Sequence, residues 1–236
     1  MTNRVIFMDQ AGFIVLTDKV IMVFDYTRDP AHALHRTLEQ NPELPVVFFS
    51  TDHHAGHSRH SQYELAQNHR RVYVMSNEIY PQNVPSTLEV AGMSAGDVLD
   101  SLPGDITVKA YKTLGKGIGF LVTEKDGTRI FHTGDSVSRL TDQKQVYDFQ
   151  IAVGRMKEEF DSVDIAFLPV DTRMTDDCHR VADIFLKAVQ TANLFPMDFD
   201  GEFIEACNFT TQERYGATIH CLHTPGQSIA LAAQPA

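Results

Sequence analysis

Short apolar runs separated by turn residues recur along the whole chain. Near the N-terminus, three such runs rich in β-branched and aromatic side chains are separated by Gly12 and the turn 17–19, which predicts a meander of three strands. The runs 46–49 and 165–168 are apolar without alternation, which is typical of strands covered on both faces. Strands are predicted at residues 4–8, 13–16, 20–24, 46–49, 72–75, 106–111, 118–124, 128–132, 165–168, 193–195, 218–222 and 228–231.

Helical spacing of apolar side chains occurs between these strands. Asp29 and Pro30 suit the start of a helix, because Asp accepts hydrogen bonds from free amides and Pro is tolerated in the first turn. Leu34 and Leu38 give that helix an apolar stripe. Helices are predicted at residues 29–41, 61–69, 145–160 and about 177–190.

This order of elements predicts an α/β protein. Meanders in both halves, each joined to helix–strand units, favour two sheets packed face to face with helices outside, a four-layer αββα sandwich. No linker, low-complexity tract or repeat interrupts the sequence, so a single domain spanning 1–236 is expected. Residues at strand ends would then gather along one edge of the sandwich.

Charge and hydropathy narrow the function classes. Acidic residues outnumber basic ones 31 to 20, for a net charge of −11, and no Lys/Arg run offsets this, so no nucleic-acid partner is expected. The apolar stretch 12–24 is broken by Asp18 and Lys19, which excludes a transmembrane helix there and argues against a signal peptide. We expect a cytoplasmic protein without a membrane partner, and the sequence leaves a homo-oligomer open.

The cysteine spacing gives no metal or disulfide framework. Cys178, Cys207 and Cys221 are widely spaced, form no C-x-x-C pair and are odd in number. We interpret them as reduced, packed thiols.

Histidine is the one unusual feature of the composition. Four of the eleven lie within eight residues, and the segment 51–57 reads Thr-Asp-His-His-Ala-Gly-His directly after a predicted buried strand. Imidazoles and a carboxylate at such separations can converge on a cation such as Zn²⁺ or its first-row neighbours. The alternative interpretation is a solvated polar loop.

Three further strands end in residues that could contribute to the same edge. Residues 131–135 read Phe-His-Thr-Gly-Asp, where Gly permits a tight turn that presents Asp135. The run 168–171 ends in Asp171, and the run 194–200 contains Asp198. Each segment alone is also ordinary loop sequence.

Taken in order, these segments resemble the metallo-β-lactamase-fold hydrolases, within them the branch similar to ascorbate-6-phosphate lactonase. The resemblance covers most of the chain and rests on residues 12–26, 51–57, 116–122, 131–135, 164–171 and 195–198. It implies the metallo-β-lactamase fold and a metal centre.

Several family positions differ here. The family's Thr-His-x-His-x-Asp-His loop places Asp52 where a His is expected and Gly56 where the Asp is expected, whereas His54 and His57 match. A later family His has no counterpart in residues 111–115, and the last His is replaced by Asp198. Asp135 matches the family's bridging Asp.

The resemblance therefore implies a site rich in carboxylates. The implied metal ligands are Asp52, His54, His57, Asp135 and Asp198, and the candidate general acid or base groups are His53 and Asp198, with His132 as a packed or supporting residue. Five donors can hold one metal ion together with a water ligand, whereas two ions would have few protein ligands each. Oxygen-rich ligands shift preference from Zn towards Mn, Fe or Mg.

Two hypotheses for function follow. The first is a metal-dependent hydrolase of a small ester, lactone or phosphate ester, acting through a metal-activated water on a small-molecule substrate. The alternative is a catalytically impaired protein of the same fold that binds a ligand or partner, which the changes at Asp52, Gly56 and Asp198 favour. A nuclease is disfavoured because the chain has no basic tract.

Overall fold

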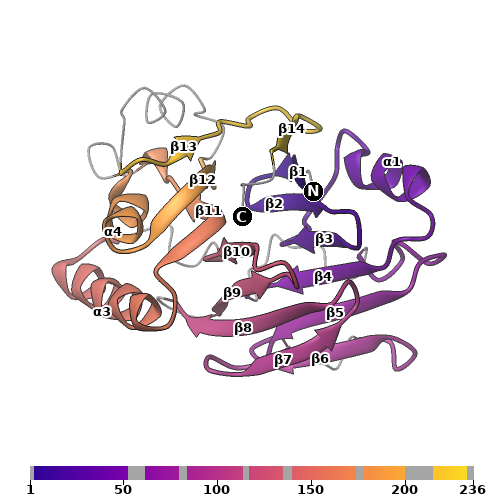
Figure 1. Ribbon diagram of the computed structural model, residues 1–236, viewed down its shortest axis with the longest axis horizontal. Helices are drawn as coiled ribbons and strands as arrows, with labels where there is room; N and C mark the ends of the chain where they lie inside the picture. Colours follow the sequence, from indigo (N-terminus) through magenta and orange to yellow (C-terminus); the bar gives the residue numbers. More distant parts are fainter. Residues whose placement is uncertain are drawn as a thin grey trace.

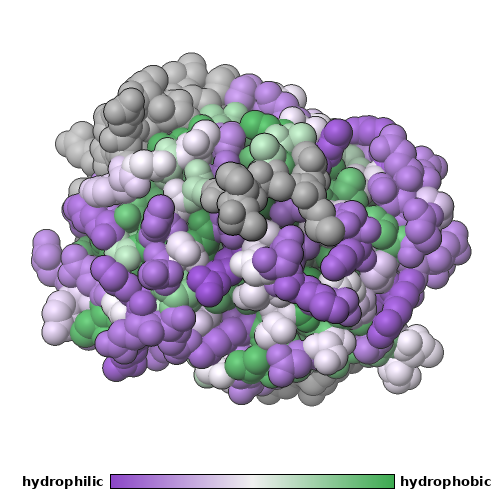
Figure 2. All heavy atoms as spheres, in the orientation of Figure 1, coloured by the Kyte–Doolittle hydropathy of each residue, from purple (hydrophilic) through white to green (hydrophobic). Residues whose placement is uncertain are grey.

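Two β-sheets lie face to face in the computed structural model, which describes residues 3–52, 62–79, 84–113, 117–134, 140–173, 178–199 and 215–232. Within these residues, fourteen strands form two seven-stranded sheets, and three helices lie outside them (Figure 1). Figure 2 shows that hydrophilic side chains cover most of one face, with apolar residues in small patches.

The first sheet contains the predicted N-terminal meander. Its strands are, in spatial order, β14 (Ser228–Leu231), β1 (Asn3–Asp9), β2 (Gly12–Leu16), β3 (Ile21–Phe24), β4 (Val46–Ser50), β5 (Arg71–Ser76) and β6 (Glu89–Met93). β1, β2 and β3 pair antiparallel, whereas β3, β4, β5 and β6 run parallel. Every residue of β3 and β4 is buried, as expected for strands covered on both faces.

The second sheet is built in the same way from the second half of the chain. Its strands are, in spatial order, β13 (Thr218–Ile219), β12 (Gln190–Met197), β11 (Ser162–Pro169), β10 (Arg129–His132), β9 (Ile118–Thr123), β8 (Ile106–Lys112) and β7 (Val98–Leu102). β10, β11, β12 and β13 run parallel, and β7, β8, β9 and β10 pair antiparallel.

Aromatic side chains fill the space between the sheets. The ring of Phe13 lies 4.5 Å from that of Phe167, and the ring of Phe49 lies 5.4 Å from that of Phe120. All four are fully buried, and burying each side chain contributes on the order of 2–3 kcal/mol to the free energy of unfolding. This shared core holds the strand ends of the two sheets in a fixed relation.

Helices cover the two outer faces. α1 (Ala33–Gln40) packs Leu34 and Leu38 on the outer side of the first sheet. α3 (Gln143–Glu159) and α4 (Arg180–Ala188) cover the second sheet, where Phe185 stacks on Phe131 at 4.9 Å. The predicted αββα layering is confirmed (Figure 1).

The start of α1 shows how the sequence sets a boundary. The Asp29 carboxylate accepts hydrogen bonds from the amides of Ala33 and Leu34, both at 2.8 Å, as predicted for a capping residue. The helix nevertheless begins at Ala33 rather than at residue 29, because His32 has a left-handed backbone with φ 53°.

The helix predicted at 61–69 holds at Gln62 but is wrong at residues 63–69, where residues 63–68 form turns. Ala66 has a left-handed backbone with φ 52°. The Arg71 guanidinium donates hydrogen bonds to the carbonyl oxygens of Tyr63 and Leu65, which in a helix would accept from backbone amides.

Several strands also depart from the sequence prediction, and the strand predicted at 218–222 ends at Ile219. β6 and β7 were not predicted, because most of their side chains are exposed and the pattern carries little apolar signal. β12 continues past the predicted end through Pro196 to Met197, since β13 pairs only with Asn193 and Leu194 and leaves this end of β12 at the edge.

The cysteines differ from the expected three reduced thiols. Cys178 is buried and Cys221 is disulfide-bonded, so the expectation is wrong for Cys221, and Cys207 lies outside the described residues. None of the described helices is long and apolar enough to cross a membrane.

Candidate functional site

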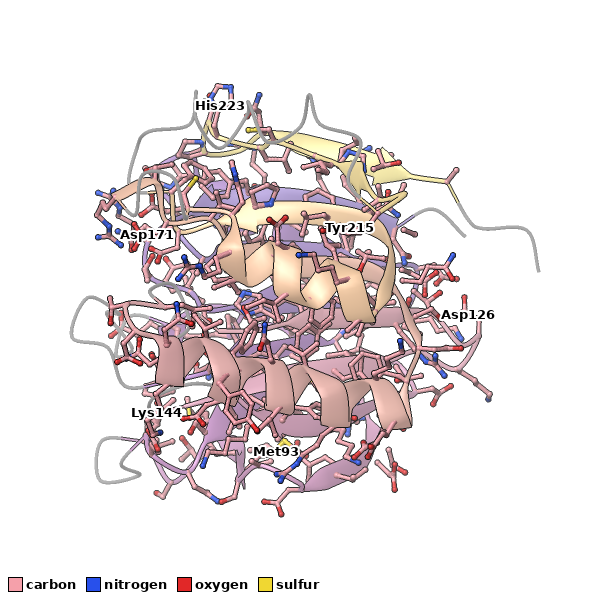
Figure 3. All side chains as sticks on the ribbon, turned by 90° about the vertical axis from the view of Figure 1, so that its left-hand side faces the viewer. Met93, Asp126, Lys144, Asp171, Tyr215 and His223 are labelled. Carbon is pink, nitrogen blue, oxygen red and sulfur yellow. The ribbon has the colours of Figure 1, made fainter. Side chains whose placement is uncertain are left out.

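The carboxyl ends of the parallel strands of both sheets meet at one edge of the sandwich. Asp25 follows β3, Thr51 and Asp52 follow β4, and Gly134 follows β10 by two residues. Asp198 follows β12. Asp171, two residues beyond β11, lies at this edge in Figure 3, at the opposite end of the molecule from Asp126 in the β9–β10 turn.

A buried carboxylate fixes the start of the histidine-rich loop. Asp25 is 4% exposed, and its two oxygens accept hydrogen bonds from the Thr51 amide at 2.8 Å and the Thr51 hydroxyl at 2.7 Å. Hydrogen bonds to an ionised acceptor are stronger than neutral ones. Asp25 therefore anchors the backbone immediately before Asp52.

Two glycines allow the second sheet to approach this anchor. Gly134 has φ 75°, and a Cβ atom there would stand 2.9 Å from the Cβ atom of Thr51. Gly117 has φ 98°, and a Cβ atom there would stand 2.6 Å from the Cβ atom of Asp52. Only glycine combines these backbone angles with such close contact, so both positions support the convergence of the loops.

His132 belongs to the supporting structure of the site. Its ring is fully buried and stacks on Phe24 at 5.3 Å. Nδ1 accepts a hydrogen bond from the Gly134 amide at 3.0 Å, and Nε2 lies 3.1 Å from the Ala11 carbonyl oxygen, to which it donates. Because both ring nitrogens serve the backbone, His132 holds the β10 turn in place, as its packed interpretation predicted.

Asp198 directly follows β12 and has a left-handed backbone conformation. Its φ is 58°, and its amide donates to the Gln10 carbonyl oxygen at 3.4 Å. Its carboxylate side chain is 20% exposed. The 10–11 turn thus contacts both Asp198 and His132, and links β12 to β10 at this edge.

An arginine places a positive charge beside Asp198. The fully buried Asp171 accepts from Arg173 through Nε at 2.6 Å, Nη2 at 2.7 Å and the backbone amide at 3.1 Å. Nη2 of Arg173 also lies 3.8 Å from Oδ2 of Asp198. Asp171 therefore orients the guanidinium rather than facing the site as a ligand.

Two of the predicted site residues lie in the described part of the chain. Asp52 is 4% exposed, at the end of β4, and Asp198 lies at the end of β12. His53, His54, His57 and Asp135 lie outside the described residues. Within the described residues no three metal-ligating side chains form a group.

The two described residues of the predicted ligand set, Asp52 and Asp198, are both carboxylates, a donor type that divalent cations accept. Carboxylate oxygens at the ends of β4 and β12 are hard donors that suit Mn, Fe or Mg as well as Zn. Arg173 already supplies one positive charge next to Asp198, which reduces the negative charge left for a cation.

Two other described histidines, His220 and His69, make contacts within the fold. His220 stacks on Phe195 at 4.9 Å and its Nε2 lies 2.8 Å from the Asn193 side-chain oxygen. Burial lowers the pKa of His220. Nδ1 of His69 lies 2.8 Å from the Leu44 carbonyl oxygen.

Sequence reasoning missed Asp25 and Arg173 as parts of this edge. A charged residue directly after the wholly apolar run Ile21–Phe24 is the signal that could have identified Asp25. Arg173 carries no such signal, because its role depends on Asp171, two residues earlier.

Comparison with known protein families finds one match. A family described as Beta-lactamase superfamily domain matches residues 4–198. A search of curated proteins finds no match.

Several solved structures are similar to the whole chain. Igni18, a metallo hydrolase from Ignicoccus hospitalis, is 16% identical with a TM-score of 0.66, covering 99% of this chain and 100% of that one. The metallo-β-lactamase fold protein YhfI from Bacillus subtilis is 9% identical with a TM-score of 0.63, covering 97% and 98%. CmlA, a diiron β-hydroxylase from Streptomyces venezuelae, is 13% identical with a TM-score of 0.64, covering 97% of this chain and 54% of that one. At these identities the similarity shows the fold.

Proposed function

Because the chain belongs to the β-lactamase superfamily, we propose that it is a metal-dependent hydrolase of a small ester, lactone or phosphate ester. The observation that carries this proposal is the continuous set of contacts that brings the ends of β3, β4, β10 and β12 together at one edge. Each of these strands delivers a carboxylate, or the segment that contains one, to that edge.

The proposed metal ligands are Asp52, His54, His57, Asp135 and Asp198. We propose one or two ions of Zn, Mn or Fe; the carboxylate-rich set favours Mn or Fe over Zn. Igni18 is named as a metallo hydrolase and CmlA as a diiron enzyme, which supports a divalent metal in this fold.

A divalent cation in such a site makes water more acidic and polarises a carbonyl or phosphoryl oxygen. The protein's own contribution is to fix the donors. Asp25 holds Thr51, and His132 holds the Gly134 turn. Hydrogen bonds made around a metal site keep the ligating side chains in their productive orientation.

Proton transfer is assigned to His53 and Asp198. The guanidinium of Arg173 lies 3.8 Å from the Asp198 carboxylate and places a positive charge beside this proposed proton acceptor. The same positive charge would attract a negatively charged oxygen of the substrate.

We further propose a lactone or phosphate-bearing substrate, which the resemblance to the ascorbate-6-phosphate lactonase branch favours. We propose no nucleic-acid or membrane partner, and a homo-oligomer stays open. A cytoplasmic location is our proposal. Fractionation of the expressing cells tests it: we expect the protein in the cytoplasmic fraction, and recovery in another fraction would contradict the proposal.

The direct test is hydrolysis with defined metals. Protein stripped with a chelator would be reloaded with Mn²⁺, Fe²⁺ or Zn²⁺ and assayed with p-nitrophenyl acetate and bis(p-nitrophenyl) phosphate. We expect Mn²⁺ or Fe²⁺ to support more activity than Zn²⁺, and Asp198→Asn to lower kcat about 100-fold. The exposed Asp18→Asn is the matched control. A pure Zn²⁺ preference would show that the ligand set is wrong, and activity that survives stripping would remove the hydrolase proposal.

A further inference from the structure

The segment that carries Arg173 runs beside the end of β12. The Val170 amide donates to the Met197 carbonyl oxygen at 2.9 Å, and the Thr172 hydroxyl donates to the Phe199 carbonyl oxygen at 3.1 Å. All four of these residues are buried. The two hydrogen bonds therefore hold the segment in a fixed position against the last residues of β12 and the turn that follows it.

The Arg173 guanidinium reaches Asp198 from this segment. Its Nη2 atom lies 3.8 Å from Oδ2 of Asp198. The fully buried Asp171, labelled at this edge in Figure 3, accepts hydrogen bonds from Nε and Nη2 of the same guanidinium at 2.6 and 2.7 Å. Such two-point contacts fix the orientation of an arginine, and arginine is effectively always protonated in proteins. A permanent positive charge is thus held beside the Asp198 carboxylate.

Three of the carboxylates that follow strands at this edge are already engaged within the protein. Asp25 accepts two hydrogen bonds from the residue after β4. Asp171 accepts three from Arg173, and Asp198 lies beside the same guanidinium. These side chains hold the edge together, which leaves fewer carboxylates there to surround several cations.

β8 also ends at this edge, because it runs parallel to β10 through their shared neighbour β9. Its last residue and the next are Lys112 and Thr113, which carry neither a carboxylate nor an imidazole. The hydroxyl of Tyr111 donates to Glu159 of α3 instead. The described end of β8 therefore adds no typical ligand for a divalent metal.

A second divalent ion at Asp198 would compete with the guanidinium for this carboxylate. Like charges repel, and their repulsion in a partly buried site is several-fold stronger than in bulk water. More carboxylates or imidazoles would be needed to offset it, and the described strand ends supply few that are not already engaged. The arrangement therefore favours one ion with one fixed guanidinium over two ions.

On the basis of the metal-dependent hydrolase proposed above, we propose that the site holds a single divalent ion and that Arg173 supplies the second positive charge at Asp198. Asp171 orients the guanidinium for this task. Arg173 is a positioning residue, because it acts through Asp198: it holds the carboxylate and offsets part of its negative charge.

The number of Mn²⁺ ions bound per chain tests this proposal. The full chain, stripped with a chelator, would be titrated with Mn²⁺ while the free ion is measured by electron paramagnetic resonance. We expect about one equivalent to bind to the wild type. Two equivalents together with hydrolysis would overturn the single-ion proposal and leave the hydrolase proposal standing. No bound Mn²⁺ and no hydrolysis would remove both.

Variants of Arg173 test whether the guanidinium takes the place of a second ion. Arg173→Gln removes the fixed charge and leaves two carboxylates to a cation, so it should bind a second equivalent, whereas Arg173→Lys keeps a charge and should still bind one. Arg155→Gln, at an exposed position of α3, removes the same charge elsewhere and should also bind one. An unchanged count in Arg173→Gln, or an equal rise in Arg155→Gln, would overturn the proposal.

A double variant keeps the test valid if Arg173→Gln does not fold, because that substitution removes the guanidinium from buried Asp171. Arg173→Gln/Asp171→Asn leaves no buried charge at this position, and circular dichroism checks its fold. It should bind one Mn²⁺ about tenfold more tightly than the wild type, since Asp198 no longer lies beside a cation. Equal or weaker Mn²⁺ binding in the folded double variant would overturn the proposal.

Discussion

Replacing Asp25 with Asn tests whether a buried carboxylate holds the metal-binding loop. Asp25 accepts two hydrogen bonds from Thr51, at 2.8 and 2.7 Å, while only 4% exposed. Asn keeps one acceptor oxygen and turns the other position into a donor that faces a donor. Losing one charge-assisted bond and weakening the other should lower the free energy of unfolding by about 2 kcal/mol.

For a protein of this size, that loss corresponds to a Tm lower by about 6 °C. Differential scanning calorimetry measures it, and Asp18→Asn, an exposed position in the turn before β3, should leave the Tm unchanged. Thr51→Val removes the hydroxyl alone and should cost about 1 kcal/mol. The Asp25→Asn variant should also bind Mn²⁺ about tenfold more weakly. Wild-type Tm and Mn²⁺ affinity in this variant would refute the role assigned to Asp25.

Three other perturbations test the packing around the site. Arg173→Met should lower the free energy of unfolding by about 2 kcal/mol, because it leaves the fully buried Asp171 without its guanidinium partner. Adding Asp171→Asn to the same chain should recover part of the lost stability. Urea titration measures both variants, and an unchanged midpoint for Arg173→Met would contradict the pairing. Burial lowers the pKa of His220, so the folded state binds this proton less readily than the unfolded state. Stability should therefore fall as pH drops through and below the usual imidazole range, and His220→Gln should flatten that slope in thermal melts; equal slopes would count against it. Gly134→Ala should destabilise by about 3 kcal/mol through backbone strain and close contact, whereas Gly154→Ala in open space on α3 should stabilise slightly; similar melting points for the two variants would contradict the close approach.

The strands that build the core were predictable because burial leaves a clear pattern. Wholly apolar runs such as Val46–Ser50 and the alternating Ile106–Lys112 carry their own signal. The exposed strand Glu89–Met93 carries little, since its pairing depends on β5 rather than on its own side chains. The turns at 63–68 were not predicted because they depend on Arg71, outside the segment, which donates a hydrogen bond to the Tyr63 carbonyl oxygen.

The site was predictable only in part, for a similar reason. Asp52 could be proposed because it lies in the histidine-rich segment after an apolar run, and Asp198 because it ends another apolar run. The roles of Asp25 and Arg173 depend on partners brought close by the fold, Thr51 across 26 positions for Asp25 and Asp198 from β12 for Arg173. Spacing along the chain does not encode such contacts.

The central claim is a metal centre at the shared edge, and metal content tests it most directly. Protein purified without chelator would be analysed by plasma mass spectrometry, beside the double variants His54→Ala/His57→Ala and, as a control, His35→Ala/His223→Ala. We expect about one or more equivalents of Mn, Fe or Zn per chain in the wild type and the control, and loss of the metal in the first variant, with its circular dichroism unchanged. A wild type without bound metal, or a first variant that keeps its full content, would contradict the account.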